Sequence, residues 1–207
     1  LQVVNDILDF SQLQAGKLRL NPIDHELQTL AQELHVRHDA KANSKGVVLR
    51  IQVDPALPLR VHGDRNRLLQ ILHNLVDNAI KFTTEGGVDV RFLVQEENLR
   101  IEVQDSGRGI APDRQQHIFR RFEHADVQTN RAYGGTGLGL TLCEKLVLLH
   151  GGEIGVQSTQ GQGALFWLTL PLQAAHDQSP LLESLDDGLV DEALSVLVVD
   201  DNRVNLM

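Results

Sequence analysis

The stretch Asn74-Leu-Val-Asp-Asn78-Ala-Ile-Lys81-Phe-Thr83 places two amides and a lysine at helical spacing, with apolar residues between them. Residues on a helix advance by about 100° each, so Asn74, Asn78 and Lys81 fall within a stripe of about 60°. Such a face can provide an oxygen ligand for a hard cation and a positive charge for phosphate. Taken alone, such a stripe is more often a solvated polar face, so that interpretation is favoured until other motifs are considered.

The segments around this stretch predict an α+β fold. Asp64 can cap a helix that runs to about Phe82, and residues of period two on either side predict extended strands. Further helices are expected at about 1–20, 24–45 and 137–149, and strands at about 47–53, 88–94, 99–103, 153–158 and 164–170. The expected core is a sandwich of one mixed sheet with helices packed on one face.

Two glycine-rich turns flank a polar segment. Asp105 ends a predicted strand just before Gly107 and Gly109, so its carboxylate is held where the backbone can turn toward a ligand such as the amine of a base. A simple turn-forming role explains this pattern as well. The second run opens the next helix and would offer an anion site through the amides of Gly135, Thr136, Gly137 and Leu138. No strand feeds directly into it, which disfavours a Rossmann fold.

The combination is more specific than its parts. The segments 74–83, 105–109, 118–122 and 135–139 resemble the N, G1, F and G2 boxes of sensor histidine kinases, in order and with matching gaps. The resemblance extends from about residue 1 to 172. It implies the Bergerat ATP-binding fold, which is shared with DNA gyrase B, MutL and the heat-shock chaperone ATPases.

The resemblance implies a role for each motif residue. Asn78 would bind the Mg²⁺ that bridges the ATP phosphates, Lys81 would contact those phosphates, and Asp105 would accept a hydrogen bond from the adenine amine. Asn74 and Lys81 are the implied catalytic residues, and Phe119 and Phe122 are expected to pack rather than touch substrate. The implied nucleotide-binding set is Asn74, Asn78, Lys81, Phe82, Asp105, Gly107, Gly109, Gly135, Thr136, Gly137, Leu138 and Gly139.

Position 74 distinguishes among relatives of this fold. The hydrolysing members carry Glu four residues before the metal-binding Asn, as general base for water. Asn74 is an amide and cannot take a proton from water at neutral pH. Phosphoryl transfer to a better nucleophile is therefore favoured over a self-standing ATPase activity.

Both ends of the chain extend the resemblance. Residues 4–17 look like the end of the second helix of a dimerisation and phosphoacceptor hairpin, and residues 196–205 look like the first strand of a receiver domain. Asp200 and Asp201 would then lie in the receiver's Mg²⁺ site. The expected layout is a hairpin end at 1–20, a catalytic ATP-binding domain at 21–172, a linker at 173–194 and the start of a receiver at 195–207, as in a hybrid histidine kinase.

The segment His25-Glu-Leu-Gln-Thr29 imitates a phosphoacceptor box. It lacks the usual proline, has Gln in place of Arg, and follows the hairpin's second helix, whereas the true box belongs to the first. We therefore expect the acceptor histidine to lie upstream of Leu1, and the phosphorylated receiver Asp downstream of Met207.

Composition limits the partners. A net charge of −9 over 207 residues argues against nucleic acid as a partner, and no apolar run approaches the ~18 residues of a membrane span. The lone Cys143 is expected to be a buried apolar group. We expect a cytoplasmic region of a protein anchored in the bacterial inner membrane, homodimeric through its hairpin and serving a receiver domain or response regulator. The alternative is a regulatory module that acts by dimerising with another sensor kinase without phosphotransfer of its own.

Overall fold

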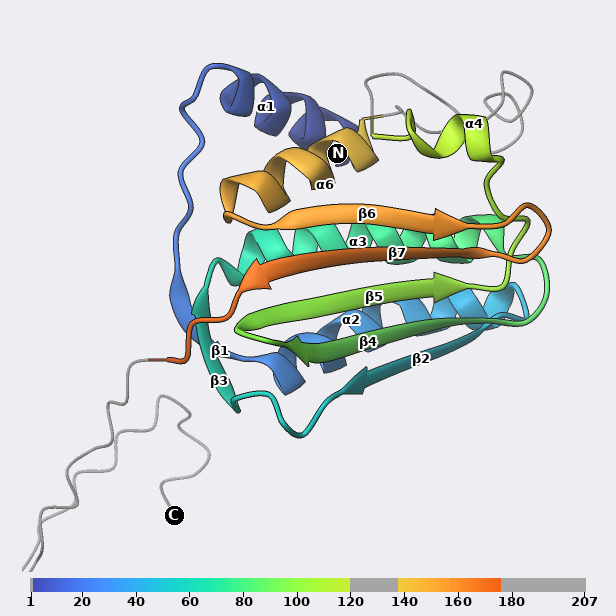
Figure 1. Cartoon of the computed structure of the whole chain (residues 1–207), viewed down its shortest axis with the longest axis horizontal. Helices are drawn as coiled ribbons and strands as arrows, with labels where there is room; N and C mark the ends of the chain where they lie inside the picture. The colour runs from blue at the N-terminus through green and yellow to red at the C-terminus, as the bar shows by residue number, and fades with distance from the viewer. Residues whose placement is uncertain (1, 120–137, 176–207) are drawn as a thin grey trace, which may run out of the picture. The chain divides into compact units, whose positions relative to one another are not determined.

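A computed structural model describes residues 2–119 and 138–175, with side chains from Ile7 onward. The first compact unit of the chain covers Leu1–His176. Its centre is a five-stranded sheet in the order β2-β4-β5-β7-β6, in which β2 runs parallel to β4 and all other neighbours are antiparallel (Figure 1). The strands are β2 (Val48–Val53), β4 (Gly87–Gln95), β5 (Asn98–Asp105), β6 (Glu153–Ser158) and β7 (Ala164–Pro171).

Helices cover one face of this sheet, as Figure 1 shows for α2, α3 and α6. The N-terminal helix α1 packs beside α6, and the short α4 lies next to β6. The helices are α1 (Gln2–Gln14), α2 (Leu27–Ser44), α3 (Arg65–Phe82), α4 (Pro112–Gln115) and α6 (Gly139–Leu149). The predicted α+β sandwich with one mixed sheet and helices on one face is confirmed. Within the described ranges, no helix is both long and apolar enough to span a membrane.

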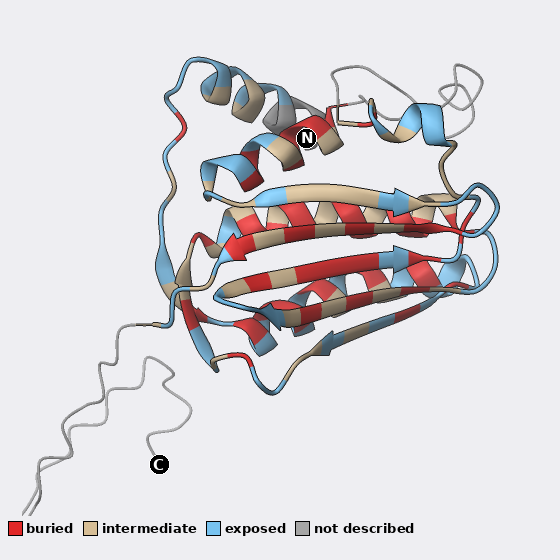
Figure 2. Cartoon of the chain, viewed as in Figure 1, coloured by how far each residue is buried: buried red, intermediate tan, exposed pale blue. Residues whose placement is uncertain are grey.

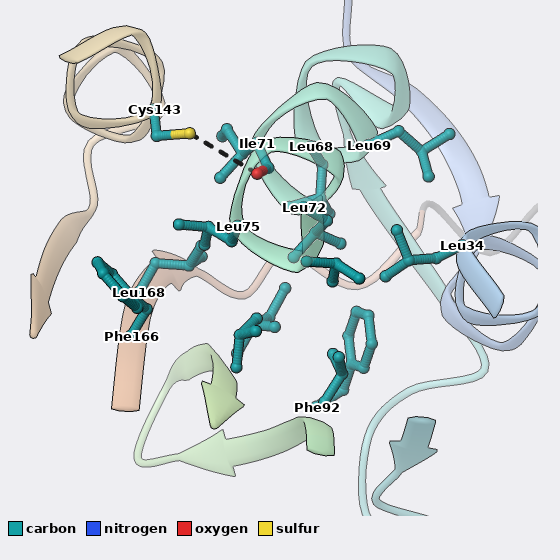
Figure 3. Packing of buried hydrophobic residues seen from close by; sticks show 14 of the residues in the cluster. Leu34, Leu68, Leu69, Ile71, Leu72, Leu75, Phe92, Cys143, Phe166 and Leu168 are labelled. Carbon is teal, nitrogen blue, oxygen red and sulfur yellow. Dashed lines mark hydrogen bonds between the residues drawn. The ribbon is translucent and has the colours of Figure 1, made fainter. Parts of the chain in front are cut away.

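The core lies between α3 and the sheet. Alternate residues of the central strands are buried in Figure 2, as the period-two pattern predicts. Figure 3 shows Leu72 and Leu75 of α3 between that helix and the strands that carry Phe92 and Leu168. Fully burying a side chain of this size contributes about 1.5–3 kcal/mol, so this layer fixes α3 on the sheet. Cys143 is buried in the same cluster, as predicted, and its Sγ lies 3.7 Å from the carbonyl oxygen of Ile71.

The N-terminus of α3 is capped by Asp64, as predicted. Its Oδ1 accepts a hydrogen bond from the Arg67 amide at 3.0 Å, which satisfies one of the unpaired amides of the first turn. Its Oδ2 accepts a second from the Asn21 amide at 2.7 Å. One carboxylate therefore fixes both the start of α3 and the chain that arrives from α1.

The second helix begins later than the sequence predicts. Residues 24–26, expected at the start of a helix over 24–45, belong instead to strand β1 (Ile23–Glu26), and α2 starts at Leu27. β1 pairs antiparallel with β3 (Arg60–Gly63), a strand that the sequence pattern did not predict. Backbone pairing between residues far apart in the sequence outweighs the local helix preference there. The sequence pattern did not indicate this pairing, because each strand has only four residues and little periodicity.

The expected linker starts within the folded unit. The Gln173 carbonyl accepts a hydrogen bond from the His62 amide, and Ala174 pairs with Val61, so residues 173–175 extend the small β1-β3 sheet. The rest of the expected linker, to residue 194, and the expected receiver strand at 195–207 with Asp200 and Asp201 lie outside the described residues.

Candidate functional site

The amide stripe lies on α3, opposite the face that packs on the sheet. Asn74, Asn78 and Lys81 are partly exposed, while the intervening Leu75 and Ala79 are buried. Neither Asn74 nor Asn78 makes a side-chain hydrogen bond within the described parts of the chain. The structure therefore brings these predicted residues to one surface, with two amides that can bind a ligand.

The stripe faces the start of α6. The Oδ1 of Asn74 lies 3.2 Å from the position that a β-carbon on Gly139 would occupy. Gly139 is the first residue of α6, and Leu138 is its N-cap. The N-terminal end of α6, where unpaired amides favour anions, is thus adjacent to Asn74. Gly135, Thr136 and Gly137, which were predicted to add amides to this anion site, lie outside the described residues, as does Phe122.

Asp105 ends the central strand β5 with its carboxylate nearly buried. Its Oδ1 accepts hydrogen bonds from the amides of Gly107 at 2.8 Å and Ala164 at 3.3 Å, and its Oδ2 has no partner among the described residues. Burial raises the pKa of the Asp105 carboxyl, and the two amide hydrogen bonds lower it in part. A fixed carboxylate with one uncommitted oxygen is suited to accept a hydrogen bond from a ligand amine.

The first glycine turn is packed too tightly for any other residue. A β-carbon on Gly107 would overlap the carbonyl oxygen of Phe82, at the end of α3. Gly109 has φ +66°, and a β-carbon there would overlap the carbonyl oxygen of Thr159, in the turn between β6 and β7. The two glycines therefore join Asp105 to α3 on one side and to the β6-β7 turn on the other.

Cations surround the end of α3. Two cations lie near the Phe82 ring: the Lys81 ammonium is 5.1 Å from its centroid, and the Arg108 guanidinium is 4.7 Å from it. Burial lowers the pKa of Lys81, and the neighbouring charges of Lys41 and Arg108 lower it further. An anionic ligand would relieve this repulsion. Sequence analysis missed Arg108, although its position between two glycines at the end of a strand was an available signal.

A second polar cluster joins α2 to α3 beside the amide stripe and was also missed. His38 Nε2 lies 2.8 Å from His73 Nδ1, and His38 Nδ1 lies 3.3 Å from Asp77 Oδ1, which Lys41 also contacts at 2.6 Å. Burial and the Arg37 charge lower the pKa of His73 to about 4. Burial raises the pKa of Asp77, but the hydrogen bonds from His38 and Lys41 outweigh it and bring the pKa to about 2.

The remaining sequence expectations concern packing. The Phe119 ring meets Phe166 edge to face, with centroids 6.4 Å apart, which is the packing role predicted for it. His25, in the segment that imitates a phosphoacceptor box, is buried in β1, and its Nδ1 lies 3.0 Å from the Ile23 carbonyl oxygen. Its Nε2 is buried, has no hydrogen-bond partner among the described residues and is not presented to solvent as an acceptor would be.

Comparison with known families agrees with this geometry. Residues 63–174, more than half of the chain, match the family described as histidine kinase-, DNA gyrase B-, and HSP90-like ATPase. The chain belongs to this ATPase family. Within the family it is an ATP-binding catalytic domain of the histidine kinase type, as the relatives described next show.

Curated relatives of this ATPase domain are hybrid and sensor kinases. Hybrid signal transduction histidine kinase K of Dictyostelium discoideum is 38% identical over 99% of this chain and 18% of its own length. Sensor protein GacS of Pseudomonas syringae pv. syringae is 43% identical over 86% of this chain and 20% of its own length. The ATPase chain thus spans about a fifth of these relatives.

Solved structures share the fold of the ATPase domain. Full-length ShkA, crystallised in complex with AMPPNP, aligns with a TM-score of 0.75 and 35% identity, over 84% of this chain and 36% of that one. The bound AMPPNP is an observation on ShkA and not on the chain described above.

Proposed function

We propose that this domain binds Mg-ATP and donates the γ-phosphoryl group to a histidine on a dimerisation hairpin, for onward relay to a receiver aspartate. The observation that carries the proposal is Asp105: a nearly buried carboxylate with one uncommitted oxygen, at the end of the central strand. Gly107 and Gly109 allow the turn beside it to pack closely against neighbouring backbone. Lys81 and Arg108 supply positive charge at the adjacent end of α3. These groups suit the amine and the phosphates of an adenine nucleotide.

Magnesium fits the amide stripe. The side-chain oxygens of Asn74 and Asn78 are without partners among the described residues, and oxygen is the ligand that Mg²⁺ prefers. Asn78 is the proposed ligand, and the ion would neutralise charge on the ATP phosphates. Lys81 and the amides at the start of α6, with those of Gly135 to Gly137, are proposed to hold the phosphate oxygens.

Transfer is favoured over hydrolysis because position 74 carries an amide. An Asn side chain cannot act as general base for an attacking water. Asn74 lies against Gly139, where it is placed to orient phosphate or metal-bound groups rather than to take a proton. The nucleophile is therefore expected to be the imidazole of the acceptor histidine.

The proposed layout follows the sequence expectation. Residues 1–20 are assigned to the end of the dimerisation hairpin, 21–172 to the catalytic domain, 173–194 to the linker, whose first residues pair with β3, and 195–207 to the start of a receiver, with Asp200 and Asp201 in its metal site. In the whole protein we propose a homodimer formed through the hairpin, a receiver or response regulator as phosphoryl acceptor, and an anchor in the bacterial inner membrane.

Nucleotide affinity tests the site. Calorimetric titration of the chain with ATP and Mg²⁺ should show binding that falls about 10- to 100-fold in Asp105→Ala, since a hydrogen bond to a charged group contributes about 1.5–3 kcal/mol. Asn78→Ala should abolish the Mg²⁺ dependence. Asp89→Ala, at a partly exposed position of β4, and Asn43→Ala, at an exposed position of α2, are matched controls. Unchanged affinity in both site variants would overturn the site assignment.

Phosphotransfer needs a separate test on the full-length protein. Incubation with γ-labelled ATP should give an acid-labile, base-stable phosphohistidine, and Asn78→Ala should lose it. Nucleotide binding without any labelled protein would instead identify a regulatory module that dimerises with another kinase. Rapid phosphate release by the isolated domain would identify a self-standing ATPase.

A further inference from the structure

Lys45 joins the end of α2 to the end of α3. It is the C-cap residue of α2, and its Nζ donates hydrogen bonds to three carbonyl oxygens: Ile80 at 2.7 Å, Lys81 at 3.0 Å and Thr83 at 3.0 Å. An ammonium group has three N–H donors, so all three are used. The last carbonyls of a helix lack partners within the helix, and a cation there also interacts favourably with the helix dipole.

The turn that Lys45 holds is one wall of the proposed nucleotide site. It carries Lys81 and Phe82, and the Phe82 ring is in contact with both the Lys81 ammonium and the Arg108 guanidinium. The Phe82 carbonyl lies so close to Gly107 that no β-carbon fits between them. The Gly107 amide in turn donates to Asp105 Oδ1 at 2.8 Å. A chain of direct contacts therefore runs from the Lys45 ammonium to the Asp105 carboxylate.

We propose that Lys45 is a positioning residue for adenine nucleotide binding. Its ammonium holds the last turn of α3 against the end of α2. It thereby keeps Lys81, Phe82 and the Gly107 turn in a fixed position relative to Asp105. Lys45 itself touches no ligand. This inference rests on the proposed function, because the residues that Lys45 positions are those proposed to bind the nucleotide.

The test compares Lys45→Met, which keeps the aliphatic stem and removes the charge, with Lys45→Arg, which restores donors. Lys17→Met is the control, because Lys17 also follows a helix and is exposed, and its side chain makes no hydrogen bond or ion pair with α3 in the described residues. Affinity for ADP with Mg²⁺ is measured by calorimetry at a temperature where circular dichroism shows every variant fully folded. Lys45→Met should weaken binding by about 3- to 30-fold, the range of indirect coupling effects. Lys45→Arg should recover most of the loss, and Lys17→Met should match the wild type.

A second readout does not depend on nucleotide. In ¹H–¹⁵N spectra of the ligand-free protein, Lys45→Met should shift the amide resonances of Phe82, Gly107 and Asp105, and Lys17→Met should leave them in place. A lower melting temperature with unchanged ADP affinity and unchanged resonances at these positions would overturn the inference and leave Lys45 a stabilising residue only. A wild type that binds no nucleotide would overturn the proposed function, whereas normal wild-type binding with an equally tight Lys45→Met would overturn the Lys45 proposal alone.

Discussion

The Oδ1 atom of Asn74 lies 3.2 Å from the place where a β-carbon on Gly139 would sit. α3 and α6 are therefore in close contact where the amide stripe meets the start of α6. A side chain at position 139 and the amide at position 74 compete for the same space. Glycine at position 139 thus costs some helix propensity, and in return it leaves room for Asn74 beside the anion-favouring end of α6.

This contact predicts a coupled pair of mutations. Gly139→Ala gains helix propensity but crowds Asn74, so its effect on the free energy of unfolding should be small. In an Asn74→Ala background the crowding is absent, and the same change should be more stabilising by about 0.5–1 kcal/mol. Urea unfolding of the four proteins of this cycle measures the difference. Additive effects would show that Asn74 moves aside at no cost.

Two glycines of positive φ should respond differently to alanine. Gly161 has φ +83° and open space around its α-carbon, so Gly161→Ala should cost only the left-handed backbone strain, about 1–2 kcal/mol. Gly109→Ala adds an overlap with the Thr159 carbonyl and should cost about 2–5 kcal/mol. Chemical denaturation of the two variants checks the order, and equal losses would contradict the close packing of the first glycine turn.

Acid should destabilise the fold through His73. Its pKa is lowered to about 4 in the folded chain from 6.5, so between these values the unfolded state binds more protons. The contribution to stability is fully present above pH 6.5 and is lost as pH falls toward 4. It amounts to about 1–3 kcal/mol after allowing for partial exposure of the ring. In His73→Gln the melting temperature should fall less over this range, and an NMR titration of the His73 ring with a midpoint near 6.5 would refute the prediction.

Arg108 should act on phosphate rather than on adenine. It is exposed and lies over the Phe82 ring, so Arg108→Gln removes one of the cations near Lys81. Affinity should fall about 3- to 10-fold for ATP, less for ADP and hardly at all for adenosine, as expected for one partly screened charge. Arg50→Gln, at an exposed position on the edge strand β2, is the control. Equal losses of affinity for ATP, ADP and adenosine would indicate that Arg108 acts on the adenine instead.

Sequence patterns predicted what depends on regular periodicity. The helical spacing of Asn74, Asn78 and Lys81 and the strand that ends at Asp105 were both found, because a buried face repeats at a fixed interval. The short strands β1 and β3 were missed, since four polar-rich residues carry too little periodicity and their pairing joins residues as far apart in the sequence as Ile23 and Gly63.

The contacts that complete the candidate site are also nonlocal. Lys45 reaches carbonyls 35 to 38 residues further along the chain, and His38 meets His73 across two helices. Neither contact produces a periodic pattern in the sequence. Arg108 was overlooked although its two glycine neighbours were an available signal, and its contact with the Phe82 ring is nonlocal.

The position of Asp105 on β5 has a consequence for how the domain opens. β5 is the middle strand of the five, paired along its length with β4 and β7, and Asp105 lies opposite Val88 and Ala164. Amides of such a strand exchange with solvent only when much of the domain unfolds, while edges and termini open far more often. The end of β5 that is proposed to recognise the adenine is therefore expected to be among the slowest-exchanging parts of the fold. A signal that switches the proposed nucleotide binding on and off is then expected to act on other elements, because this one persists until the domain itself unfolds.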